Sequence, residues 1–303
     1  MLCSDDKHPD DLIEGHIDAL VRRGIAKGIP VWNLLQAAVV NPVKHYNMGT
    51  GLLNVGDDAT FIAVNNLKDF NVLKTVIDGV TVYDAANGGV DESALITATP
   101  SAETPNNFKA SKITTSDIAV EIPSSGKARV IIAYDGQLLT GQEIVPVSDL
   151  ACADIQKIVV YNRYGNGTPK VAYIKGFDLK NGAIGASIAH DSHNIVSIGT
   201  SDEDIVSAIN GLIDAKGGVV VADNSGVDVL PLPIAGIMTD RPAEEISSKY
   251  RILDSKAKAL GCNLRAPFIT MAFMALPVIP SLKLTDMGLV EVDAFDFTNL
   301  FIE

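Results

Sequence analysis

The stretch Ala183–Gly199, AIGASIAHDSHNIVSIG, contains two apolar runs that are separated by five hydrogen-bonding side chains. Ala183–Ala189 and Ile195–Gly199 have the length and near-continuous apolar character of strands buried in a sheet. The five polar residues between them, called the pentad below, are His190, Asp191, Ser192, His193 and Asn194. Polar groups are costly among buried strands unless they are hydrogen-bonded, so we expect the pentad to carry function.

The sequence on both sides of this stretch predicts an α+β domain. Ser201 and Asp204 form a capping pair in front of a helix that ends at Gly217-Gly218, and a second helix is expected from about Ala243 to Leu260. The further strands that the pattern predicts are Val130–Tyr134, Ile158–Tyr161, Val171–Ile174, and the hairpin pair Val219–Ala222 and Val227–Leu230. Residues 112–303 should therefore form a domain with a mixed or antiparallel sheet.

The first 48 residues are expected to be mainly helical. Pro9 suits the first turn of a helix that continues to Gly24. A second helix should begin near Pro30 and end before Asn41-Pro42, because the residue before a proline disfavours helical geometry. Met1–Cys3 resemble the last residues of a buried strand.

From Gly49 the hydrophobic period changes to two, which is typical of strands. Strands are expected at Ala59–Val64, Val72–Ile77 and Val80–Tyr83, the last two joined by an Asp78-Gly79 hairpin turn. Residues 85–111 show no sustained period, so we predict a long connection there.

Composition excludes several classes of partner. The 24 Lys and Arg are outnumbered by 37 Asp and Glu, which gives a net charge of -13. Nucleic acid and anionic membrane surfaces are therefore not expected as partners. The longest apolar stretch, Phe268–Ile279, is too short to span a bilayer. The three scattered cysteines favour a reducing cytoplasm over a disulfide-linked protein.

Short segments along the whole chain follow one another in an order that is more specific than any single motif. They are Cys3-Ser4-Asp5-Asp6-Lys7-His8, Asn41-Pro42, Gly56-Asp57-Asp58-Ala59, Gly176-Phe177, Ala189–Asn194, Leu230–Gly236 (LPLPIAG), Ala275–Pro280 (ALPVIP), Leu284-Thr285-Asp286 and Phe301-Ile302-Glu303. Together they resemble the C-terminal part of the bacterial-type adenine deaminase family, within the amidohydrolase superfamily.

The resemblance implies a division of the chain into four parts. Residues 1–48 would be the last strand end and the final helices of a (β/α)8 barrel, and residues 49–84 a segment of a β-sandwich subdomain. Residues 85–111 would be a connection and residues 112–303 the C-terminal α+β domain. The barrel strands that carry the family's metal-binding His-x-His pair are not in this sequence, and one strand end cannot close a barrel. The chain is thus expected to be the C-terminal half of a longer enzyme, inactive without the N-terminal barrel half, and a homo-oligomer.

The activity that the resemblance implies is hydrolysis of adenine to hypoxanthine and ammonia with a divalent metal ion, manganese or iron. By the family pattern Asp5 would bind the metal and carry a proton from the attacking water to the leaving group. The alternative for Asp5, and equally for Asp6, is that it caps the following helix.

Three interpretations of the pentad remain open. It can close or orient the active site, because mixed donors and acceptors suit the edge of a purine. It can form a metal site from His190, Asp191 and His193, or a polar turn that satisfies backbone groups. If it is extended, His190, Ser192 and Asn194 point to one side and the other two residues to the opposite side.

Two other functions compete with adenine deamination. One is a non-catalytic remnant or accessory domain, and the other a related deaminase that acts on another purine or cyclic amide. Release of ammonia from adenine, once the barrel half is supplied, would favour adenine deaminase over the non-catalytic remnant or accessory domain.

Overall fold

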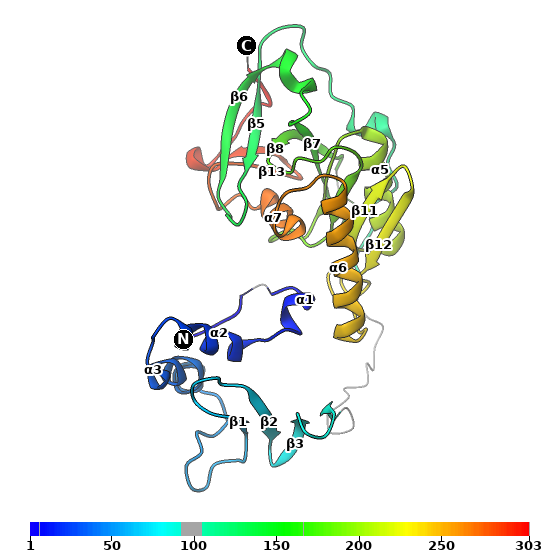
Figure 1. Ribbon diagram of the computed structural model, residues 1–303. Coiled ribbons are helices and arrows are strands. Elements are labelled where there is room, and N and C mark those ends of the chain that lie inside the picture. Colours follow the sequence, from blue (N-terminus) through cyan, green and yellow to red (C-terminus); the bar gives the residue numbers. More distant parts are fainter. Residues whose placement is uncertain (6, 92–104, 166, 303) are drawn as a thin grey trace. The chain divides into compact units, whose positions relative to one another are not determined.

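The structure is a computed structural model that describes residues 1–5, 7–91, 105–165 and 167–302 (Figure 1). The chain divides into two compact units, Met1–Ala102 and Glu103–Glu303. Helices and several sheets are mixed along the chain, which confirms the predicted α+β class. Asp6, Glu303 and part of the expected connection 85–111 lie outside the described residues.

A nine-stranded sheet forms the centre of the unit Glu103–Glu303. Its strands are β5 (Lys127–Ala133), β6 (Thr140–Pro146), β7 (Gln156–Tyr161), β8 (Lys170–Lys175), β9 (Ala183–Ala186), β10 (Ile195–Gly199), β11 (Gly218–Asp223), β12 (Gly226–Pro231) and β16 (Phe301–Ile302). The order is β12-β11-β9-β10-β7-β8-β5-β16. Strand β6 lies off this path and pairs with β5. The described pairs are antiparallel except for β5 and β8, so the sheet is mixed.

Helices cover both faces of this sheet and produce a three-layer unit. Helix α5 (Asp202–Ala215) packs on one face, where Val220 and Ala222 of β11 join its apolar residues. Helices α6 (Ala243–Ala259) and α7 (Pro267–Ala272) pack with the opposite face, which receives Val219 and Val221. The division follows from the alternation of side chains along a strand. Because both faces are buried, β9 and β10 consist entirely of buried residues.

The start of α5 confirms the predicted cap. Ser201 Oγ accepts a hydrogen bond from the backbone N–H of Asp204 at 3.1 Å and donates to the Asp204 carboxylate at 2.6 Å. These bonds satisfy a backbone donor that a helix N-terminus otherwise leaves open.

The strand predicted at Ala183–Ala189 ends three residues early, at Ala186. Pairing with β10 stops at Ala186, while the Ser187 backbone N–H still donates to the Gly218 carbonyl of β11 at 2.9 Å. The Ser187 hydroxyl also donates to the Gly236 carbonyl at 2.6 Å and accepts from the Gly218 N–H at 2.8 Å. The connection to β10 therefore starts at Ser187 and contains the whole pentad.

A second, three-stranded antiparallel sheet was not expected from the sequence. It consists of β13 (Leu282–Thr285), β14 (Gly288–Glu291) and β15 (Asp296–Phe297). It follows α7 and the 3₁₀ turn η5 (Phe273–Ala275) along the chain. Leu282, Leu284 and Leu289 bury their side chains in the same core as α6 and α7.

The helices of the unit Met1–Ala102 differ from the prediction in two places. They are α1 (Pro9–Leu12), α2 (Ile17–Ala26), α3 (Val31–Leu35), the π-helix η1 (Gln36–Val40) and α4 (Asn41–His45). The single helix expected from Pro9 to Gly24 is interrupted, since Gly15 has a φ of 155° that no helix contains. The second helix does not end at Asn41-Pro42, because the wider π turn before it lets the chain pass a proline that has no N–H.

The opening residues Met1–Cys3 have no ladder partner among the described residues, so the expected strand is absent from the part of the chain that the structure describes. The Leu2 N–H instead donates to the Ala37 carbonyl at 3.1 Å.

A four-stranded antiparallel sheet completes this unit, in the order β1 (Phe61–Val64), β2 (Val72–Ile77), β3 (Val80–Asp84) and β4 (Gly89–Val90). The predicted hairpin is confirmed: Asp78 and Gly79 have φ of 49° and 81°, and a two-residue type I′ turn requires positive values at both positions.

The helices of both units are short. The longest described one, α6, has 17 residues, which corresponds to about 25 Å at the rise of an α-helix. Among the described residues, no helix combines the length and the apolar composition needed to cross a bilayer.

Candidate functional site

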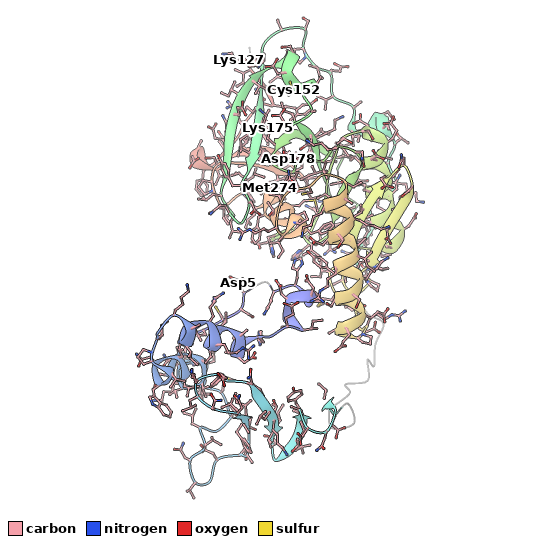
Figure 2. The ribbon with its side chains drawn as sticks, in the orientation of Figure 1. Asp5, Lys127, Cys152, Lys175, Asp178 and Met274 are labelled. Atoms are coloured by element: carbon pink, nitrogen blue, oxygen red, sulfur yellow. The ribbon has the colours of Figure 1, made fainter. Side chains whose placement is uncertain are left out.

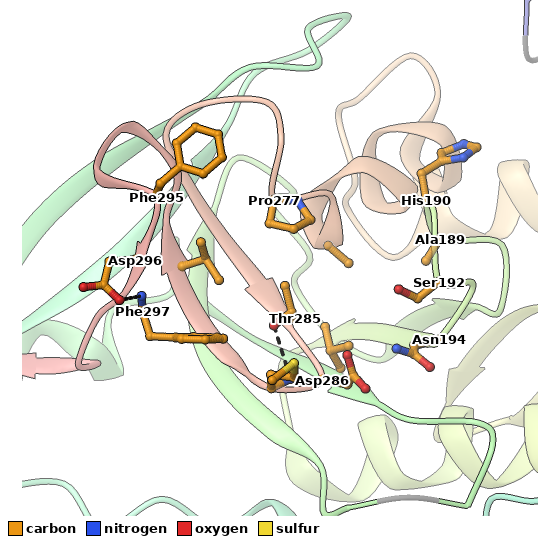
Figure 3. Close-up of a pocket in the computed structure, with 14 residues that line it drawn as sticks. Ala189, His190, Ser192, Asn194, Pro277, Thr285, Asp286, Phe295, Asp296 and Phe297 are labelled. Carbon is orange, nitrogen blue, oxygen red and sulfur yellow. Dashed lines mark hydrogen bonds between the residues drawn. The ribbon is translucent and has the colours of Figure 1, made fainter.

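A cavity of about 400 Å³ lies against the pentad in the unit Glu103–Glu303 (Figure 3). The pentad forms one side of it and β15 the opposite side, with Pro277, Thr285 and Asp286 between them. Small-molecule sites usually have volumes of roughly 300–1,000 Å³ and combine apolar walls with a few polar groups. This cavity has both properties.

The pentad is a turn and not an extended strand. The His193 N–H donates to the Ala189 carbonyl at 2.6 Å, and His193 has a φ of 52°. His190, Ser192 and Asn194 nevertheless line the cavity together, while the Asp191 side chain is 85% exposed. The structure thus gathers three of the five predicted residues around one space.

His190 is held by the segment that follows α7. Its backbone N–H donates to the Ala272 carbonyl at 3.1 Å, and its ring stacks on Phe273 with 4.7 Å between centroids. The His193 ring meets the His190 ring edge-on at 5.7 Å. The two histidines and Phe273 therefore form a continuous aromatic group beside the cavity.

A fully buried lysine binds the backbone of Phe273. Lys283 of β13 has no exposed surface, and its Nζ donates to the carbonyls of Phe273 at 3.0 Å and Leu138 at 2.9 Å. Burial lowers the pKa of Lys283 from 10.5 to about 8, because the charged ammonium loses its hydration.

The segment 162–164 holds the other end of the pentad. Asn194 is only 4% exposed, and its Oδ1 accepts from the Arg163 N–H at 3.3 Å. The Tyr164 hydroxyl donates to the Ser192 carbonyl at 2.9 Å and accepts from the Arg163 guanidinium at 3.0 Å. These bonds support the turn interpretation for part of the pentad, since Asn194 satisfies a backbone group.

Asp286 lines the cavity but is not among the site residues predicted from the sequence. It lies in the turn between β13 and β14, and its Oδ2 accepts from Asn162 Nδ2 at 2.6 Å. Asn162 in turn accepts from the Tyr164 N–H at 2.9 Å. The segment 162–164 therefore fixes both the pentad and Asp286. The signal that could have indicated Asp286 is a carboxylate between two short apolar strands. It was missed because the β13–β14 hairpin was not predicted.

Asp5 belongs to the other unit and stands exposed ahead of α1 (Figure 2). The N-cap of α1 is His8, so the alternative that Asp5 caps this helix is wrong; Asp6 lies outside the described residues. Asp5 has a φ of 54°. Close by, Ser4 Oγ and His16 Nε2 are hydrogen-bonded at 2.8 Å.

The described residues contain no group of three or more His, Cys, Asp or Glu side chains that could hold a metal ion. The interpretation of His190, Asp191 and His193 as a metal site is therefore unsupported in this part of the chain. Asp5 could supply at most one ligand to a metal whose other ligands come from elsewhere.

Two families match the chain. Residues 137–296 match the adenine deaminase C-terminal domain, and residues 1–82 match the amidohydrolase family.

Curated relatives match nearly the whole chain. The adenine deaminase of Methanosarcina barkeri is 46% identical over 99% of this chain, that of Sulfurovum sp. 45% over 99%, and that of Borreliella burgdorferi 38% over 99%. The chain spans only 55–56% of the length of these three relatives.

Proposed function

The chain belongs to the adenine deaminase family, and from this premise we propose that it is the C-terminal part of an enzyme that converts adenine and water to hypoxanthine and ammonia. The observation that carries the proposal is the 46% identity to an adenine deaminase along 99% of the chain. Because the chain spans about half of such relatives, its partner in catalysis would be the N-terminal barrel half.

The reaction adds the water oxygen to the ring carbon that bears the amino group and then breaks the carbon–nitrogen bond. Of the two protons of the attacking water, one ends on the ring nitrogen beside the new carbonyl, and the other must be transferred to the departing ammonia. We assign this transfer to the Asp5 carboxylate, which suits a group that accepts a proton and then donates it.

The amidohydrolase family implies a divalent metal ion, which when bound brings the pKa of water close to neutrality. Manganese or iron is our proposal for its identity. The described residues do not assemble a metal site, so the remaining ligands would come from the barrel half.

The proposal is tested with a chimera in which this chain replaces the corresponding part of the Methanosarcina barkeri relative. We expect the chimera, supplied with manganese or iron, to release ammonia and hypoxanthine from adenine. Asp5→Asn should lower kcat by roughly 10²–10⁴-fold, because the amide cannot carry the proton. Asp11→Asn, in the exposed first turn of α1, serves as the matched control and should retain activity.

An inactive but folded chimera would favour the non-catalytic accessory domain, and turnover of another purine or cyclic amide in place of adenine would favour the related deaminase. A cytoplasmic location belongs to the same proposal and is supported by the three cysteines, all of which are free.

We further propose that the pentad orients the substrate or closes the active site. In the chimera, His193→Ala should lower kcat/KM about tenfold or more, because small displacements of positioning groups are costly in catalysis. His193→Asn distinguishes the contribution of the imidazole ring from that of the backbone turn. Asparagine tolerates a positive φ, so this variant should keep the turn and lose only the imidazole. Unchanged kinetics in both variants would leave the pentad as a structural turn.

A further inference from the structure

We infer that the cavity beside the pentad is itself a binding site for a planar heterocycle with a cyclic amidine edge, that is, an amino group next to an unprotonated ring nitrogen. The choice of adenine as this heterocycle rests on the proposed function. Within the unit Glu103–Glu303, Asp286 and Asn194 would form hydrogen bonds with the edge of the ligand.

Asp286 supplies a hydrogen-bond acceptor. Asn162 Nδ2 donates to Oδ2 at 2.6 Å and holds the carboxylate in one orientation. No hydrogen bond to Oδ1 is formed among the described residues, and Asp286 lines the cavity. A carboxylate oxygen fixed in this way accepts a hydrogen bond from an amino group without first losing another partner.

Asn194, which lines the same cavity, supplies a donor. Its Oδ1 is engaged by the Arg163 N–H at 3.3 Å, which leaves the Nδ2 end of the amide for the cavity. The side chain is almost fully buried, so its orientation is set by this bond and by its surroundings. Figure 3 shows Asn194 and Asp286 at the same end of the cavity.

An acceptor and a donor that line the same cavity complement an amidine. The amino group of adenine donates, and the adjacent ring nitrogen accepts. Hypoxanthine presents the opposite pattern at the same edge, because its carbonyl oxygen accepts and its ring N–H donates. The Asp286 carboxylate would then face a carbonyl oxygen, and two acceptors in contact repel.

The remaining walls suit a flat ring. Pro277, Val290 of β14 and Phe297 of β15 also line the cavity. Aromatic and apolar surfaces bind the faces of a heterocycle, while polar groups at one end fix its orientation. The cavity, at about 400 Å³, is large enough for a bicyclic base.

The test is direct titration of the 303-residue chain with free adenine and with hypoxanthine, followed by calorimetry and by NMR of the ligand. We expect adenine to bind and hypoxanthine to bind roughly tenfold more weakly or not at all. Asp286→Asn should remove this preference, because an amide can donate to the hypoxanthine carbonyl. Asp214→Asn, on the exposed surface of α5 and paired with Lys112, is the matched control and should keep the preference.

Asn194→Asp provides an independent variant, since it keeps an acceptor for the Arg163 N–H and replaces the amide donor with a carboxylate oxygen. We expect it to weaken adenine binding by about tenfold while thermal melting shows a folded protein. Equal binding of the two bases to the unmodified chain, no binding of adenine, or an unchanged preference in folded Asp286→Asn would each overturn the inference.

The outcome is separable from that of the proposed function. Deaminase activity of the chimera without adenine binding to this chain would leave the function standing and remove the inference. Adenine binding to this chain, together with an inactive chimera, would support the binding site and contradict the proposed function.

Discussion

Replacement of Gly176 by alanine is expected to lower the free energy of unfolding of the unit Glu103–Glu303 by about 4 kcal/mol, as the sum of backbone strain and overpacking. Gly176 follows β8 with a φ of +100°, a region that side chains rarely adopt. A Cβ there would lie 2.3 Å from the Ala133 carbonyl oxygen at the end of β5. Neither strand can move away easily, because β5 and β8 pair in the sheet and Phe177 is fully buried.

Hydrogen exchange of the β5 and β8 amides measures this effect without contributions from the other unit. The matched control is Gly226→Ala, which also has a positive φ, +134°, but has no atom within 4 Å of the added Cβ. It should cost only about 1–2 kcal/mol, the strain of the backbone alone. Equal losses in the two variants would contradict the steric explanation.

The second large effect is a dependence of stability on pH that comes from Lys283. Its pKa in the folded protein is about 8, below the ordinary value of 10.5, because of burial. Between these two values the unfolded chain binds more protons than the folded one, so stability rises with pH. The contribution is fully present above pH 10.5 and is lost as the pH falls toward 8. It amounts to about 3 kcal/mol, at 1.36 kcal/mol for each unit of pKa.

Urea denaturation at several pH values between 8 and 10.5 would measure this, with Lys283→Met as the comparison because methionine has a similar length and no charge. The difference in unfolding free energy between the two proteins should change by about 3 kcal/mol across the window, in favour of the lysine protein as the pH rises. Lys112→Met removes an exposed lysine and should give a difference that stays nearly constant. A constant difference for Lys283→Met would mean that this ammonium is hydrated in the folded protein.

The sequence predicted the elements whose signals are local. The Ser201 cap with its helix, the β11–β12 hairpin and the Asp78-Gly79 turn each depend on a few neighbouring residues. The small sheet of β13–β15 was missed because its strands have only two to four residues and no sustained alternation. The early end of β9 was missed because it depends on Gly218 and Gly236, which are distant in sequence.

In the candidate site, too, the features with a local sequence signal were predictable and those that depend on distant contacts were not. The pentad was predictable because polar residues interrupt two apolar runs. A turn was one of its open interpretations, but the sequence could neither select it nor indicate Asp286, because both depend on contacts from Asn162 and Arg163 across 124 and 31 residues. Pairings over such distances leave no periodic trace in one sequence.

Strand β12 forms one end of the large sheet and would offer unpaired backbone groups to a strand from another molecule. Asp228 stands in the middle of this strand and is bound by Lys249 at 2.5 Å and Lys256 at 2.9 Å, both on α6. An incoming strand would have to displace or bury these charges, and Pro231 at the end of β12 has no N–H to offer it. The β12 edge should therefore resist edge-to-edge pairing with the sheet of another molecule. Copies of the protein that associate would use other surfaces.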